Sequence, residues 1–135
     1  MFEMLLGHCV GDYLLQNDWM ALGKSKHDGL GWLSCTVHCL LYTMAVCVTM
    51  WMFYPAWILI VFASHFALDK FGLPEKYLRA VRGRSLGLFL ENPENTTYTP
   101  HVGLRAGFTT FVYVVADNTM HLLIMWGMWR LFFEV

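Results

Sequence analysis

The most constraining feature of this sequence is a long stretch without charge. Residues 30–53 contain no Asp, Glu, Lys or Arg, and this run exceeds the ~20 apolar residues that a helix needs to cross a bilayer. Across the 135-residue chain, 57% of the residues are hydrophobic and only 14% are charged, whereas soluble domains carry about 25% charged residues. Because the charged shell of a soluble domain is missing, we predict an integral membrane protein.

Three further stretches have the composition of membrane segments. Residues 55–72 predict a short span that begins at a proline, and residues 106–131 are long enough to cross with tilt. Residues 2–22 are the most polar of the four, so we expect a short or partly re-entrant helix there. The sequence therefore predicts an all-α, polytopic membrane protein, with a compact bundle of about four transmembrane helices forming one integral membrane domain over residues 1–135.

The positive charges gather in the predicted connections. Most of the Lys and Arg residues lie in a loop over residues 73–105, of which residues 74–84 have the pattern of a short basic amphipathic helix at the membrane surface. The positive-inside rule places this basic side in the cytoplasm. The formal net charge of −1 excludes a strongly basic nucleic-acid binder, so we expect no nucleic-acid partner.

The four cysteines lie in apolar stretches and form no C-x-x-C pair. This spacing argues against a disulfide framework or a zinc ribbon. We interpret them as small buried residues without a redox role.

Costly polar side chains lie inside the predicted spans. Three segments each carry a His and an Asp four residues apart, a spacing that puts both on one helix face, and the segment 30–53 carries a His with a Tyr one turn further along. An ionised residue at bilayer depth costs at least about 2.5–3.5 kcal/mol, so these groups are expected to converge inside the bundle. They are His8, Asp12, His38, His65, Asp69, Asp117 and His121.

Three explanations fit such a cluster. His and carboxylate side chains are ligands for zinc, manganese or iron, and a metal site can activate water against an ester or phosphoester. The same residues suit a proton or cation relay in a small transporter or channel subunit, or a structural network in a protein that modulates a larger membrane complex. We favour a divalent-metal site with hydrolase activity on a lipid-like substrate. All seven residues are then candidate ligands, and the candidate catalytic carboxylates are Asp12, Asp69 and Asp117.

Three residues are candidates for binding substrate beside this site. Gln16, with the two polar residues after it, either lines a polar mouth or belongs to the cap of a following helical turn. Lys24 is placed to hold a lipid phosphate, although a basic connection is also explained by topology alone. Tyr42 shares a helix face with His38. In addition, Gly11 permits a close helix approach or a kink beside Asp12.

Four motifs carry a family resemblance. The chain reads H-x-x-G-D-Y-x-L-Q-x-x-W-M from His8, H-x-x-x-Y from His38, S-H-x-x-x-D from Ser64 and D-N-x-x-H from Asp117. Together they resemble domain-of-unknown-function family 3307 of small bacterial and phage membrane proteins, over essentially the whole chain. Tyr13 stands where that family usually has Phe, and Asn118 stands where Gln is usual.

The resemblance implies a location but no established activity: an integral protein of the bacterial inner membrane, in contact with membrane lipid. Because a bundle of four short spans exposes much of its surface, we also expect a homo-oligomer or a larger membrane complex. A weaker likeness to membrane-bound metal-dependent hydrolases supports the hydrolase hypothesis by analogy alone.

Overall fold

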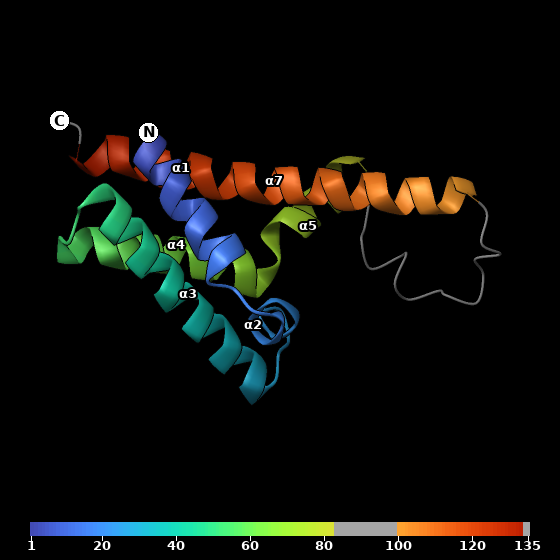
Figure 1. The fold of residues 1–135 in the computed structure, drawn as a ribbon, viewed down its shortest axis with the longest axis horizontal. Helices are drawn as coiled ribbons and strands as arrows, with labels where there is room; N and C mark the ends of the chain where they lie inside the picture. Colours follow the sequence, from blue (N-terminus) through green and yellow to red (C-terminus); the bar gives the residue numbers. More distant parts are fainter. Residues whose placement is uncertain (83–99, 134–135) are drawn as a thin grey trace. The chain divides into compact units, whose positions relative to one another are not determined.

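The structure, a computed structural model, describes residues 1–82 and 100–133, and the part of the chain so described is built of helices (Figure 1). This confirms the predicted all-α class. Residues 83–99 of the predicted basic loop lie outside the described residues. In chain order the elements are α1 (Phe2–Cys9), the π-helix η1 (Val10–Leu14), α2 (Asp18–Gly23), α3 (Gly29–Met50), α4 (Pro55–Phe71), α5 (Leu73–Arg82) and α7 (Pro100–Phe133).

The chain divides into two compact units. The first comprises Met1–Gly72 and His121–Val135, and the second comprises Leu73–Met120. The first unit therefore holds the elements from α1 to α4 together with the C-terminal part of α7. The second holds α5 and the preceding part of α7.

Two helices are long and apolar enough to cross a membrane, namely α3 and the part of α7 over Gly107–Phe133. A third span is counted if α4 and Leu73–Val81 are one span broken at Gly72. The chain is thus a polytopic membrane protein, with two or three spans among the described helices where about four were expected. One missing crossing is that of residues 2–22, which divide into α1, η1 and α2, each much shorter than the ~20 residues of a full crossing. Where two spans are counted, the 17-residue helix α4 is the other.

Local sequence explains where these helices begin and end. The side chains of Asn17 and Asp28 cap α2 and α3 by accepting hydrogen bonds from the backbone N–H groups of Met20 and Gly31, at 3.0 and 2.6 Å. The predicted cap before α2 is therefore present, with Asn17 as its acceptor. Helix α4 begins at a proline and ends where Gly72 adopts a left-handed conformation with φ of 56°.

Helix α1 and η1 lie unusually close to α3. A side chain at Gly7 would collide with Val46, and a Cβ at Gly11 would lie 2.6 Å from the Tyr42 ring. The two glycines are four residues apart and so form a small-residue face that lets the backbones approach. The predicted close approach at Gly11 is therefore observed, and it brings the residues of η1 against the middle of α3.

The apolar core of the first unit lies between these helices and α4. Because lipid is as apolar as the core, tight packing rather than escape from water holds such helices together. The buried core residues are Met4, Tyr42, Val46, Cys47, Trp57, Val61 and Met125.

The second unit contains the short helix that was expected within the loop over 73–105. Residues Leu73–Arg82 form α5, an amphipathic helix close to the expected 74–84, with a proline in its first turn. Helix α7 begins at Pro100 rather than near residue 106. Its 34 residues extend about 51 Å at 1.5 Å per residue, which exceeds the ~30 Å hydrocarbon core of a bilayer.

Candidate metal centre

Six of the seven predicted site residues converge within the first unit. They come from elements far apart in the sequence, and each has at least one ring or carboxylate contact with another member. We call this set the His/Asp cluster: His8 on α1, Asp12 on η1, His38 on α3, His65 and Asp69 on α4, and His121 on α7.

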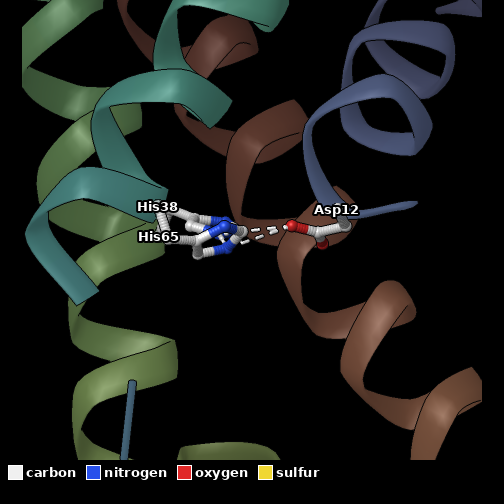
Figure 2. Close-up of side chains that lie close together, drawn as sticks. All are labelled: Asp12, His38 and His65. Atoms are coloured by element: carbon white, nitrogen blue, oxygen red, sulfur yellow. Dashed lines mark hydrogen bonds and ion pairs between the residues drawn. The ribbon is translucent and has the colours of Figure 1, made fainter. Parts of the chain in front are cut away.

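The centre of the cluster is formed by three side chains from three elements. His38 Nε2 and His65 Nε2 lie 2.9 Å apart, and Asp12 Oδ1 lies 3.3 Å from the first and 3.4 Å from the second. Figure 2 shows the two imidazole rings and the carboxylate pointing toward one another. The three candidate ligand atoms therefore face a common point.

Asp69 adds a fourth oxygen to this group. Its Oδ2 lies 3.1 Å from His38 Nε2 and 3.4 Å from His65 Nε2. In a tetrahedral zinc site with bonds of about 2.0–2.1 Å, neighbouring ligand atoms lie about 3.3–3.4 Å apart. Five of the six edges of such a tetrahedron are thus seen here, at 2.9–3.4 Å. The spacing and the donor set both fit one divalent ion.

The burial of these oxygens adds to the case for a cation. Side-chain exposure is 10% for Asp12 and 2% for Asp69. Asp12 Oδ1 and Asp69 Oδ2 are buried, and no described residue donates a well-directed hydrogen bond to either. A buried carboxylate oxygen is costly unless a cation or a donor satisfies it. The Lys24 ammonium lies 2.9 Å from Asp69 Oδ2, so Asp12 Oδ1 is the oxygen at which an ion is needed most.

The remaining histidines flank this centre. His8 Nδ1 lies 3.5 Å from Asp12 Oδ2 and is hydrogen-bonded to the Tyr42 hydroxyl at 2.9 Å. His121 Nε2 lies 3.3 Å from the second oxygen of Asp69. The Tyr42 ring stacks on His65, with centroids 3.5 Å apart and an interplanar angle of 16°. These contacts fix the orientation of the carboxylates and imidazoles at the centre.

The π-helix explains how Asp12 reaches this position. Leu15 N–H donates to the Val10 carbonyl at 3.0 Å, which is the i to i+5 bond of a π-turn. The wider turn occurs where Gly11 packs on Tyr42, and it carries Asp12 toward the rings on α3 and α4. Such single π-turns are frequently found at functional sites.

Two lysines adjoin the cluster at the ends of α2 and α4. Lys24 Nζ forms an ion pair with Asp69 Oδ2 at 2.9 Å. The neighbouring Lys70 is buried, donates to the Lys26 carbonyl at 2.5 Å and lies 4.5 Å from the centroid of the Trp32 ring. Lys24 therefore contacts the cluster directly, and Lys70 anchors the segment that carries Lys24.

The other predicted residues lie around or outside the cluster. Asp117 is on α7, four residues before His121, and belongs to the second unit. Gln16 lies in the turn between η1 and α2, whereas Tyr42 and Lys24 contact cluster residues directly, as described above.

Two residues near the cluster were not anticipated. Cys39 Sγ lies within 4.8 Å of ligand atoms on His65 and Asp69, although the cysteines had been interpreted as apolar filling. Its position directly after His38 gave no helical-face signal. Lys70 was a recognisable signal, because a lysine within an apolar run needs a partner, but the sequence could not show which carbonyls it meets.

Comparisons with known proteins bear on the family alone. No curated protein and no solved structure matches this chain. The family described as protein of unknown function (DUF3307) matches residues 1–135. The chain therefore belongs to this family, as the resemblance of its motifs predicted.

Proposed function

We propose that the His/Asp cluster binds a divalent metal ion, zinc, manganese or iron, and that the protein hydrolyses an ester or phosphoester bond in a lipid-like substrate. The observation that carries the proposal is the set of four ligand atoms from His38, His65, Asp12 and Asp69, separated by 2.9–3.4 Å along five edges. Two imidazoles and two carboxylates from three helical elements are a donor set typical of such ions.

The surrounding residues suit hydrolysis. A bound divalent ion supplies Lewis acidity and lowers the pKa of water. Asp12 is the more exposed of the two central carboxylates, at 10% against 2%. For hydrolysis, His38, His65 and Asp69 would hold the ion and leave its fourth position open to water. Asp12 would then accept a proton from that water. Lys24 is 17% exposed, and its ammonium group can hold an anionic phosphoryl oxygen beside Asp69. Asp117 remains a candidate carboxylate from α7.

We further propose a setting for this activity. The protein lies in the bacterial inner membrane with its basic connections in the cytoplasm, following the positive-inside rule. Membrane lipid surrounds the protein and supplies its substrate. A homo-oligomer, or incorporation in a larger membrane complex, would cover part of the apolar side chains that the monomer exposes, such as Trp51 and Leu131.

Elemental analysis of detergent-purified protein tests the metal site. The parent is compared with Asp12→Ala and His65→Ala, and with His27→Ala as a matched control, because His27 is exposed in the connection before α3. We expect one or two equivalents of metal in the parent and control, and a clear loss in both cluster variants. Absence of metal from the parent, even after incubation with each ion, would overturn the proposal.

Activity is tested on the same preparations. Carboxyl-ester, phosphomonoester and phosphodiester lipids are presented in mixed micelles, with and without a chelator. We expect turnover of one class, lost on chelation and restored by the ion found in the parent. A metal-loaded protein inert toward all three classes would retain the metal site and refute the hydrolase.

A proton or cation relay is the second candidate function, favoured by one specific contact. The two Nε2 atoms of His38 and His65 lie 2.9 Å apart, a distance at which imidazoles share a proton. Potential-dependent flux in liposomes by a metal-free protein would support this relay. A metal-free protein without flux or hydrolysis would instead indicate an interaction subunit of a larger complex.

A further inference from the structure

A groove opens between α3 and α4 in the first unit. Its volume is about 420 Å³. The walls are formed by large apolar side chains, including Leu40 and Met44 on α3 and Leu59 and Phe62 on α4. Several of these are more than half exposed, with Leu40 at 57% and Leu59 at 67%. The rim of the groove is therefore exposed on both walls.

No member of the His/Asp cluster lines the groove, but one end of the groove approaches the cluster along both helices. On α4, Phe62 lies three residues before His65, so the two side chains share one helix face. On α3, Thr43 lies one turn after Cys39. Cys39 Sγ in turn lies within 4.8 Å of ligand atoms on His65 and Asp69. One end of the groove is thus about one helical turn from the cluster.

The polar His/Asp cluster and the apolar groove follow one another along the pair of helices α3 and α4. Helices α3 and α4 are joined by residues 51–54, so the start of α3 and the end of α4 lie at the opposite end of the pair, where Lys24 meets Asp69. The groove is lined by residues within 40–47 and 53–62, which belong to the half near the connection. A molecule that follows both regions would have its polar group at the cluster and its apolar part in the groove.

The lining of the groove favours a flexible chain over a helix. Helices in membranes pack closely on small residues that let their backbones approach. The rim of this groove instead carries the long side chains of Leu40, Met44 and Leu59. These keep a helix backbone at a distance, whereas a narrow hydrocarbon chain can lie between them.

We infer that this groove binds the acyl chain of a membrane lipid and places the ester or phosphoester group of that lipid at the His/Asp cluster. The inference rests on the proposed function for the reaction, but binding of the chain is a separate property. It assigns the substrate class as an acyl-chain lipid drawn laterally from the bilayer. Water-soluble esters and phosphoesters of the same head group are then poor substrates.

Native mass spectrometry of protein extracted from dioleoyl-phosphatidylglycerol vesicles tests the binding. Two variants narrow the groove from its two walls, Leu40→Trp and Leu59→Trp. The matched control is Leu123→Trp, because Leu123 is similarly exposed at 59% and lies on α7 outside the groove lining. Metal content and oligomeric state are measured on each preparation.

We expect the parent and Leu123→Trp to retain about one phospholipid per chain, and both groove variants to retain at least fivefold less with unchanged metal content. Equal retention in all four proteins would overturn the inference, as would groove variants that change oligomeric state without losing lipid, which would indicate a second copy in the groove. Lipid retained by a metal-free parent would uphold the groove while refuting the proposed metal centre.

Discussion

The Lys24 ammonium lies 2.9 Å from Asp69 Oδ2, the same oxygen that His38 Nε2 approaches to 3.1 Å. A resident cation and a candidate metal ligand set thus share one carboxylate oxygen. Because a divalent ion at the centre would be repelled by the ammonium, Lys24 lowers the affinity for metal. When no metal is bound, the Lys24 ammonium compensates the buried negative charge of Asp69.

The variant Lys24→Met separates these two effects. We expect the metal-free protein to lose about 1–3 kcal/mol of stability, less than the 3–5 kcal/mol of a fully buried pair because Lys24 is 17% exposed. We expect metal affinity to rise by about tenfold from the lost repulsion. Thermal unfolding in detergent across a metal titration measures both. Lys24→Arg keeps the charge and serves as control, and a fall in metal affinity in Lys24→Met would contradict this account.

Gly11→Ala tests the close approach of η1 to α3. The added methyl group would lie 2.6 Å from the Tyr42 ring and 3.1 Å from its Cα, so we expect a loss of about 1–3 kcal/mol from overpacking and reduced metal content because Asp12 is displaced. Gly127→Ala is the matched control, since beyond the adjoining residues and backbone of its own helix no described atom lies within 4 Å of a Cβ there. Equal unfolding temperatures for the two variants would show that the helices do not need this glycine.

Tyr42 is expected to act mainly through its ring. Tyr42→Phe removes the hydroxyl bonded to His8 but keeps the stacking on His65, so we expect a cost of about 1 kcal/mol. Tyr42→Ala also removes a buried aromatic ring and should cost about 3–5 kcal/mol. Denaturant unfolding of the two variants gives the difference. If Tyr42→Phe were as damaging as Tyr42→Ala, the hydroxyl would be the essential group.

Lys70 is expected to hold the connection between α2 and α3. Lys70→Met keeps most of the side-chain volume but leaves the Lys26 carbonyl without its 2.5 Å donor, so we expect a loss of about 1–3 kcal/mol. We also expect faster hydrogen exchange in residues 24–28. Lys26→Met, at an exposed position, is the control. Unchanged exchange in Lys70→Met would mean that the connection is held by other contacts.

The membrane class and the residues of the His/Asp cluster could be predicted from the sequence, because both follow from the free-energy cost of placing polar groups in a bilayer. A stretch such as 30–53 has few alternatives to a buried helix, and intramembrane His and Asp side chains must find one another. The break within residues 2–22 was harder to predict, because it depends on the π-turn and on Asn17 as a cap. Helical periodicity alone indicates neither the π-turn nor the cap.

By itself, the sequence determined that this protein is helical, lies in a membrane and carries its polar groups on shared helix faces. Only the tertiary structure decided which atoms meet: the Nε2 atoms of His38 and His65 with Asp12 Oδ1, and Lys24 with Asp69. The physical reason is that spacing along one helix fixes a face, whereas distances between helices depend on close packing such as that at Gly11. The ligand spacing and the groove beside it are products of that packing.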